Sequence, residues 1–458
     1  MINKTQFSIE QTNAYNSCME FVKTPAPNMM TISGYAGTGK TAMMRVLVDD
    51  LEQLKYKVVC TAPTNEAVRV LAKLTGKKYN KTIYSLLGLQ LVEEDDREPI
   101  LKSNGDSKLP GFDVVIVDEA SMIHYDLFVA IQYELMMCSR CKMIFVGDPA
   151  QLPPVKDPLK ESMVFTTKTI PIVYLTEIQR TAKDNPILVA ATLIRNNLKT
   201  KTDLFERITK VNGISGIEFT EMPQDFLDKV LDDFQSDEYK KNNDYVRLLA
   251  YTNRTVDGFN DLIRKKIWNN ESPPEFIIGE KLIVDTPVVN HNRSFREVIY
   301  NVGERLEVLD AKIIKDTALG VDYWELYVIN KEALNEDEIK PYTLSIVCKP
   351  HIDMFRQKTS KIAVQCKKKL LEVDCNADGI SKKRYTNAEA WKPYFNVKNR
   401  FHKVRYNYAL TVHKSQGSTF ERVYVVEMDI NKLNWDDIER NKLKYVAFTR
   451  ASHLLRIL

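Results

Sequence analysis

The sequence contains no apolar stretch long enough to cross a membrane. Runs such as Val114–Val117 fall far below the ~20 residues that a spanning helix requires. Cysteine is scarce, with seven in 458 residues, which is too few to predict a disulfide framework in a chain of this length. The first residues, Met1–Lys4, lack the apolar segment of a secretory signal. These absences predict a cytoplasmic protein that does not associate with membranes.

Neither sign of charge dominates the chain. It has 65 basic and 61 acidic residues, a net charge of +4. This small excess favours a nucleic-acid partner only weakly, because ordinary enzymes share it. Composition predicts a multi-domain protein and leaves its function open.

Short β-branched segments alternate with amphipathic ones in the first third of the chain. The segments that have the character of buried strands are Met29–Ser33, Lys57–Ala62, Asp113–Asp118 and Met143–Gly147. Buried strands that alternate with helices predict a parallel sheet covered on both faces. A second set lies toward the other end, at Val246–Tyr251, Val404–Thr411 and Arg422–Glu427. The pattern predicts an α/β fold with two separate sheets.

The pattern changes between these two sets, from Phe276 to about residue 400. Short alternating segments broken by Gly and Pro, such as Gly279–Val284, Gly303–Leu309 and Tyr323–Ile329, predict a small β-barrel inserted into the second α/β domain. A shorter insertion, Leu89–Gly111, contains an Asn-Gly turn at 104–105 and predicts a protruding β-hairpin.

The segment from Gly34 through Gly37, Thr38, Gly39 and Lys40 to Thr41 fits the phosphate-binding loop pattern, between a predicted strand and a predicted helix. Its glycines let backbone N–H groups and the helix N-terminus face phosphate oxygens. In this pattern Lys40 neutralises the β- and γ-phosphates, and the Thr41 hydroxyl binds Mg²⁺. The loop predicts binding of a nucleoside triphosphate.

A second motif supplies two carboxylates. Four apolar residues, Val114–Val117, lead directly into Asp118 and Glu119. This order places both acids at the carboxyl edge of a sheet, where ligands of open α/β sheets bind. Asp118 would hold Mg²⁺, and Glu119 would polarise the attacking water. Together with the phosphate-binding loop, the pair predicts hydrolysis of the bound triphosphate.

Later segments resemble the motifs of superfamily 1 helicases, and in particular the RecD-like and Dda-like enzymes called superfamily 1B. Phe145–Pro154 resembles the third helicase motif. The other matches follow in family order: Thr61–Ala67 for motif Ia, Thr82–Gly88 for Ib, Leu175–Arg180 for IV, Tyr408–Gly417 for V and Tyr445–Ala451 for VI. The resemblance spans the whole chain. It implies ATP-driven 5′→3′ translocation on single-stranded DNA and duplex unwinding in replication, recombination or repair.

The resemblance also implies an architecture and partners. Two RecA-like domains would occupy residues 1–180 and 181–275 plus 403–458. The hairpin at about 89–111 would be the strand-separating pin, although it has no aromatic residue, and 276–402 would form an SH3-like barrel or tower domain. The implied ligands are ATP, Mg²⁺, and single-stranded and forked duplex DNA. A single-strand-binding or replisome protein is a further implied partner of a monomer in the cytoplasm of a bacterium or phage-infected host.

Individual roles follow from the same resemblance. Gln151 would sense the γ-phosphate, Arg180 and Arg450 would be arginine fingers, and Gln11 would recognise adenine. Ser8–Gln11 also fits a capping box at a helix start. The residues expected to contact the single strand are Pro63, Thr64, Asn65, Thr82, Ser85, Thr411, His413, Lys414 and Ser415. Trp391 and Phe395 are candidates for base stacking, with core packing as the alternative.

Other functions remain open at this point. A P-loop kinase would use the loop and the carboxylate pair and would leave Arg450 without a role. A non-catalytic nucleic-acid-binding module would not need Lys40 or Glu119. A superfamily 1B RNA helicase would carry the same motifs. A zinc site at Cys138 and Cys141 would need two more ligands at suitable spacing, which the sequence does not supply.

Overall fold

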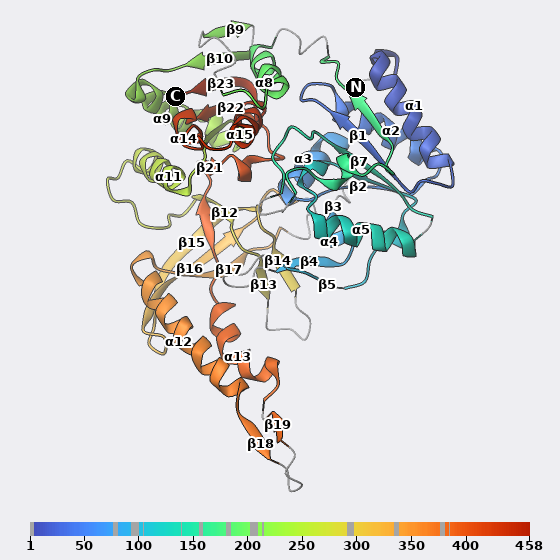
Figure 1. Cartoon of the computed structure of the whole chain (residues 1–458). Helices are drawn as coiled ribbons and strands as arrows, with labels where there is room; N and C mark the ends of the chain where they lie inside the picture. The colour runs from blue at the N-terminus through green and yellow to red at the C-terminus, as the bar shows by residue number, and fades with distance from the viewer. Residues whose placement is uncertain are drawn as a thin grey trace. The chain divides into compact units, whose positions relative to one another are not determined.

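The computed structural model describes residues 4–76, 81–92, 100–103, 105–138, 140–154, 159–179, 185–201, 209–212, 215–290, 297–333, 339–375, 381–383 and 385–458. The chain divides into two units (Figure 1). The first unit combines Met1–Asn269 with Tyr408–Leu458, and the second is Asn270–Asn407. Among the helices in the described ranges, none is both long and apolar enough to cross a membrane.

The first unit begins with a parallel sheet. Its strands are β1 (Met29–Gly34), β2 (Val58–Ala62), β3 (Lys81–Thr82), β6 (Val114–Val117), β7 (Lys142–Gly147) and β8 (Ile172–Leu175). They are ordered β3-β2-β6-β7-β1-β8, and every neighbouring pair is parallel. The predicted first sheet is confirmed. Because the strands share one direction, all their carboxyl ends meet at a single edge.

Helices cover both faces of this sheet. Val114 and Ile116 of β6 pack into one core with α1 (Ile9–Lys23), α2 (Lys40–Gln53) and α3 (Asn65–Thr75). Val115 and Val117 pack into the other core with α4 (Ile83–Leu86), α5 (Tyr125–Met137) and α6 (Met163–Thr166). Alternate residues of one strand thus serve opposite cores, as the two-residue period of a strand requires.

A second sheet completes the first unit. Its strands are β9 (Lys210–Asn212), β10 (Ser215–Phe219), β11 (Val246–Ala250), β21 (Ala409–Thr411), β22 (Phe420–Val425) and β23 (Ala451–Ile457). The order is β21-β11-β22-β23-β10-β9, parallel except for the β9–β10 pair. The helices of this half are α8 (Pro186–Asn196), α9 (Pro223–Gln235), α10 (Asp237–Lys241), α11 (Asn253–Ile267), α14 (Glu427–Ile430) and α15 (Asp437–Thr449). The second predicted α/β sheet is likewise confirmed.

Two short strands lie within the 89–111 insertion. Strand β4 (Leu89–Val92) pairs antiparallel with β5 (Ile100–Ser103), with Leu89 opposite Ser103. The link between them falls at 93–99, outside the described residues. Residue 104 of the predicted Asn-Gly turn also lies outside the described residues, so this turn stays a prediction.

The second unit contains an antiparallel sheet. Its order is β17 (Tyr342–Val347), β16 (Val321–Ile329), β15 (Arg305–Asp316), β12 (Lys281–Val284) and β20 (Val404–Tyr406). Beside it, β13 (Val288–Asn290) pairs with β14 (Glu297–Tyr300). The two ends of the sheet are linked near β20, where the His402 N–H donates to the Ser345 carbonyl over 2.8 Å. Such a link is what a barrel requires, and the SH3-like topology stays a prediction.

Two helices in this unit were not predicted. The sequence indicated only strands for 276–402, but α12 (Ile352–Leu370) and α13 (Asn387–Lys398) occupy its later part, with the β18–β19 pair (Val373–Cys375 with Ser381–Lys383) between them. Helix α13 begins with a capping box formed by Thr386 and Glu389, a signal that the sequence carried. Val404–Thr411, predicted as one strand, is also split into β20 and β21, which belong to different units.

Candidate active site

The phosphate-binding loop joins β1 to α2 at the carboxyl edge of the first sheet. Gly39 caps α2 with a left-handed φ of 74°, and a Cβ there would lie 2.4 Å from Nε2 of Gln11. Only glycine suits both conditions. The buried Thr38 hydroxyl donates to the Tyr35 carbonyl over 2.9 Å and braces the turn.

The Lys40 side chain folds back onto this loop. Its Nζ donates to the carbonyls of Gly34 (2.7 Å) and Tyr35 (2.8 Å). Burial lowers the pKa of Lys40, and the charges of Asp148, Asp118 and Glu119 act in the opposite direction. The amine therefore sits among three carboxylates at the strand ends, where a triphosphate would supply further negative charge.

Asp118 and Glu119 follow β6, which lies two places from β1 in the sheet. Glu119 has a left-handed φ of 50°, which is strained for a residue other than glycine, and its buried Oε2 has no hydrogen-bond partner. Burial and the neighbouring charge of Glu119 raise the pKa of Asp118 to about 7. A crowded, buried carboxyl group suits a hard divalent cation, so Asp118 fits Mg²⁺, and the unpartnered Oε2 of Glu119 stays available to accept a proton.

Gln11 takes part in a capping box and also contacts the phosphate-binding loop. Its Oε1 accepts the Ser8 N–H (3.0 Å) in the capping box, and its Nε2 donates to the Thr38 carbonyl (3.0 Å). The capping box is therefore present, and the same amide lies against the phosphate-binding loop. Adenine recognition by Gln11 stays a prediction.

The segment that leads to Arg180 is anchored on both sides. Glu10 accepts the N–H groups of Thr176 (2.6 Å) and Glu177 (2.8 Å), and the Gln179 N–H donates to the Gly37 carbonyl (3.1 Å). Arg180 itself lies outside the described residues. Its role as an arginine finger stays a prediction.

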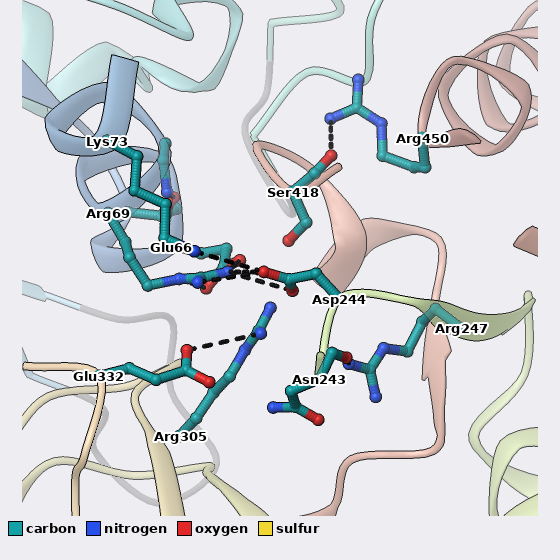
Figure 2. Close-up of polar contacts among 12 residues, drawn as sticks. Glu66, Arg69, Lys73, Asn243, Asp244, Arg247, Arg305, Glu332, Ser418 and Arg450 are labelled. Atoms are coloured by element: carbon teal, nitrogen blue, oxygen red, sulfur yellow. Dashed lines mark hydrogen bonds and ion pairs between the residues drawn. The ribbon is translucent and has the colours of Figure 1, made fainter. Parts of the chain in front are cut away.

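Arg450 stands at the C-cap of α15, in the half of the unit built on the second sheet. Its guanidinium donates to the carbonyls of Ser418 (2.9 Å) and Val446 (3.2 Å), as Figure 2 shows for Ser418. Burial lowers the pKa of Arg450, whereas the charge of Glu119 favours its protonated form. Glu119 and Arg450 therefore interact electrostatically although they belong to different sheets.

Gln416 connects the motif V segment to the first sheet. Its Nε2 lies 3.2 Å from Oε1 of Gln151, 3.3 Å from the Ser121 hydroxyl and 3.3 Å from the Leu152 carbonyl. Both glutamines are buried. The predicted γ-phosphate sensor and the predicted DNA-contacting segment are thus in direct contact.

The predicted DNA-contacting residues of the first sheet lie at the ends of its strands or just after them. Pro63 follows β2, Thr64 caps α3 by accepting the Ala67 N–H (3.2 Å), and Asn65 is the first residue of that helix. Thr82 caps the short helix α4 by accepting the N–H of Ser85 (3.2 Å). The two caps bring backbone N–H groups and hydroxyls to the carboxyl edge of the sheet.

In the motif V segment, Thr411 ends β21 and His413 begins a 3₁₀ turn, with Lys414 exposed beside it. Burial lowers the pKa of His413 and favours the neutral ring. Ser415 is fully buried, and its hydroxyl donates to the Val412 carbonyl over 2.7 Å. This burial removes the Ser415 hydroxyl from the groups that we propose for DNA contact.

Trp391 and Phe395 belong to the second unit. Both lie on α13, where their ring centroids are 6.3 Å apart, and each also packs edge-on against Tyr394 at 5.4 Å. Phe395 is 48% exposed. Cys138 and Cys141 are free thiols, and within the described part of the chain no group of three or more His, Cys, Asp or Glu side chains could hold a metal ion.

Comparison with known proteins accounts for this arrangement. The family model of an AAA domain matches residues 8–215, and that of a UvrD-like helicase C-terminal domain matches residues 406–458. Over 455 residues the chain is 26% identical to the ATP-dependent DNA helicase dda of Enterobacteria phage T4, covering 97% of each chain. These matches support the resemblance to superfamily 1B of the helicases.

Two further matches agree with this resemblance. Over 165 residues the chain is 32% identical to the ATP-dependent RecD2 DNA helicase of Deinococcus radiodurans, covering 36% of this chain and 21% of that relative. Among solved structures, a Pif1 helicase from a study of DNA unwinding at forked double-stranded DNA matches with a TM-score of 0.51. At 17% identity, that match covers 100% of this chain and 92% of the other and shows the shared fold.

Sequence reasoning missed several residues of this candidate site. Asp148 is fully buried at the end of β7, where it pairs with Arg195 of α8 over 3.0 Å and accepts the Tyr445 hydroxyl over 2.5 Å. The Arg195 guanidinium also lies 3.3 Å from the centroid of the Tyr35 ring. Asp148 and Tyr445 occur inside matched motifs, which was the available signal, whereas no local pattern marked Arg195.

Proposed function

We propose that this chain is an ATP-dependent DNA helicase that moves 5′→3′ on single-stranded DNA and unwinds duplex DNA. The observation that carries the proposal is the contact of Gln416 with Gln151, which joins the motif V segment to the nucleotide side of the first sheet. A protein that only bound a triphosphate would not need such a connection. The full-length similarity to a DNA helicase supports the same conclusion.

The residues of the site suit hydrolysis of ATP. Lys40 would exchange the Gly34 and Tyr35 carbonyls for phosphate oxygens. Glu119, with its free Oε2, would accept a proton from the attacking water, and Thr41 and Asp118 would hold Mg²⁺. When bound, Mg²⁺ supplies charge neutralisation at the phosphates. Arg450 would stabilise charge that develops on the γ-phosphate, and we retain the same proposal for Arg180.

A change at the γ-phosphate would reach DNA through a short path. Gln151 would respond to the phosphate, Gln416 would move with Gln151, and Thr411 and Lys414 lie a few residues before Gln416 in the same segment. Contacts with the backbone of the strand need no sequence information, as a translocating enzyme requires. The predicted domain limits, the pin, the action as a monomer and the cytoplasmic location remain proposals of the same scheme.

The decisive experiment measures ATP turnover and strand separation together. Turnover is measured alone, with single-stranded DNA and with single-stranded RNA. Unwinding is measured on matched duplexes with a 5′ or a 3′ single-stranded tail, made of DNA or of RNA. We expect stimulation by DNA and unwinding only from the 5′ tail. Turnover indifferent to nucleic acid would indicate a kinase-like enzyme, and preference for RNA would indicate an RNA helicase.

A further inference from the structure

The hydroxyl of Tyr445 joins three segments of the candidate site. It accepts the backbone N–H of Ala36 in the phosphate-binding loop over 3.1 Å and donates to Oδ2 of Asp148 over 2.5 Å. The ring belongs to α15, and Tyr445 is only 1% exposed. One hydroxyl group therefore connects a helix of the second half of the unit with two strand ends of the first sheet.

The direction of these bonds is set by the surroundings. Burial and the charge of Asp148 raise the pKa of Tyr445 well above its ordinary value. The hydroxyl therefore stays protonated and donates a hydrogen bond to the carboxylate. Asp148 is also paired with Arg195 and accepts the Ala150 N–H over 3.0 Å. If the hydroxyl were absent, Asp148 would keep these partners, but the contact with Ala36 would be lost.

Asp148 shapes the turn that carries the predicted phosphate sensor. The Gln151 N–H donates to the Asp148 carbonyl over 3.1 Å. One helical turn before Tyr445, Lys442 donates from Nζ to the Pro149 carbonyl over 3.0 Å. Helix α15 is thus fastened to the turn after β7 by two side chains and to the phosphate-binding loop by one of them.

The same helix ends at Thr449, and its C-cap residue Arg450 lies five residues after Tyr445. Because a helix is stiff over this distance, the point where Tyr445 is fastened sets the position of Arg450 relative to the phosphate-binding loop. We propose that Tyr445 is a positioning residue for ATP hydrolysis, which holds α15, and with it Arg450, against the loop that binds the phosphates. This inference rests on the proposed function and assigns a residue that the motif comparison left without a role.

The substitution Tyr445→Phe tests the inference, because it removes the hydroxyl and keeps the buried ring. Tyr424→Phe is the matched control. Tyr424 is fully buried in the same half of the unit, and its hydroxyl donates to Asp233 over 2.6 Å, away from the phosphate-binding loop. Both variants lose one buried hydroxyl that donates to a carboxylate, so their effects on folding are comparable.

The measurements are kcat and KM for ATP with single-stranded DNA, ATP affinity by titration, and the thermal unfolding midpoint. The free energy of a hydrogen bond to a charged group corresponds to about a ten- to hundredfold change in a rate or equilibrium constant. We expect Tyr445→Phe to lower kcat by about this factor while KM and ATP affinity stay within about threefold. Tyr424→Phe should lower the midpoint and leave kcat within about twofold.

Two outcomes would overturn the positioning role. One is a Tyr445→Phe enzyme with wild-type kcat, and the other is an equal loss of kcat in both variants that follows the fall in midpoint. Wild-type protein that binds ATP without DNA-stimulated turnover would instead refute the proposed function, and the role in hydrolysis with it. The two failures are therefore distinguishable.

Discussion

Arg69 and Asp244 form a forked ion pair between residues that lie 175 positions apart in the chain. Both terminal nitrogens of Arg69, on α3, lie 3.2 Å from Oδ2 of Asp244, which stands just before β11, and Lys73 approaches the same oxygen to 3.5 Å (Figure 2). Close by, a Cβ at Gly417, whose φ is +81°, would lie 2.9 Å from the Ala67 side chain. The helix that begins with Thr64 and Asn65 is thus held against the half built on the second sheet.

We expect Asp244→Asn to weaken this junction. The side chains of Arg69 and Asp244 are 10% and 19% exposed. We therefore expect the free energy of unfolding to fall by about 1–2 kcal/mol, between the values for an exposed and a buried ion pair. Thermal unfolding should show a midpoint lower by a few degrees. The control is Asp237→Asn, which removes an exposed pair with Lys240 and should change nothing measurable. Equal midpoints for both variants would contradict a stabilising role for the Arg69–Asp244 pair.

Replacement of Lys40 by Ala should abolish ATP hydrolysis and unwinding while the fold remains. Among the described residues the amine donates to two carbonyls of its own loop, and the further partner that we propose for it is a phosphate of the substrate. Turnover should fall on the order of 100-fold or more. Lys142→Met is the control, because Lys142 is also buried and also donates to two carbonyls, those of Pro25 and Pro27, outside the site.

The control should lose stability and keep turnover, the reverse of Lys40→Ala. Turnover is measured with saturating single-stranded DNA and the midpoint by thermal unfolding without nucleotide. A midpoint of Lys40→Ala that falls as far as that of Lys142→Met would make Lys40 a structural lysine.

Ionisation of the Glu10 carboxylate should make the free energy of unfolding depend on pH. Burial alone would raise its pKa, but hydrogen bonds from Glu177 and Thr176 outweigh burial and hold the pKa of Glu10 below its ordinary 4.5. The stabilisation is therefore present above about pH 4.5 and is lost as the pH falls through the lower, folded-state value. Glu10→Gln should lower the unfolding midpoint at pH 7, and the gap to the wild-type protein should close in acid.

The comparison variant for this prediction is Glu20→Gln, at an exposed position on the same helix. It should match the wild-type midpoint at neutral pH. If the gap between wild type and Glu10→Gln is constant from pH 7 to pH 3, the carboxylate charge is not the source of the stabilisation.

The sequence predicted those parts of the site that are encoded locally. Lys40 lies in a strand–loop pattern and Asp118 at a strand end, and about ten residues of sequence are enough to recognise each pattern. The two parallel sheets are predicted from equally local apolar segments. Tyr445 and Asp148 meet across 297 positions, and Arg195 reaches Asp148 across 47. Such contacts depend on how the elements pack, and no local pattern specifies a partner at that distance.

The inserted region was the least predictable from sequence. Helix α12 buries only Cys366 fully among its described side chains, so it lacks the wide apolar stripe that marks a helix in a sequence. Gly and Pro between short apolar segments correctly indicated the strands β12, β15 and β16. The same strand prediction was wrong for the residues that follow, which form α12 and α13. The β20–β21 break falls where a segment predicted as one strand contributes to two different units.

Affinity for single-stranded DNA should fall steeply with salt if, as we propose, the contacts with the strand are made to its phosphates. Each contact contributes about −0.7 to the slope of log affinity against log salt. Lys414, exposed in the motif V segment, should account for one of them. Lys414→Ala should reduce the slope by about 0.7 and weaken binding equally for different base sequences. Lys240→Ala, on the exposed helix α10, should leave the slope unchanged, and an unchanged slope for Lys414→Ala would remove this residue from the interface.

Replacement of Arg450 should slow ATP hydrolysis far more than it weakens ATP binding. The charge of Glu119 favours the protonated form of Arg450, whose guanidinium donates to the Ser418 and Val446 carbonyls at the end of α15. Negative charge at the γ-phosphate is greatest in the transition state, so loss of the arginine raises the barrier more than it weakens the ground state. Arg450→Ala should bind ATP within about tenfold of wild type, or roughly 1.4 kcal/mol, and hydrolyse it on the order of 10³-fold more slowly.

Two variants separate chemistry from folding in this prediction. Arg450→Lys keeps a positive charge but loses the planar guanidinium group. It should therefore be more stable than Arg450→Ala without hydrolysing ATP faster. Arg422→Ala removes an arginine of the same half that pairs with Asp233 over 2.7 Å, and it should leave turnover unchanged. Titration of ATP binding beside DNA-stimulated turnover gives the comparison. Near wild-type hydrolysis by Arg450→Ala would refute the finger, and hydrolysis without unwinding would assign Arg450 to force transmission between the two sheets.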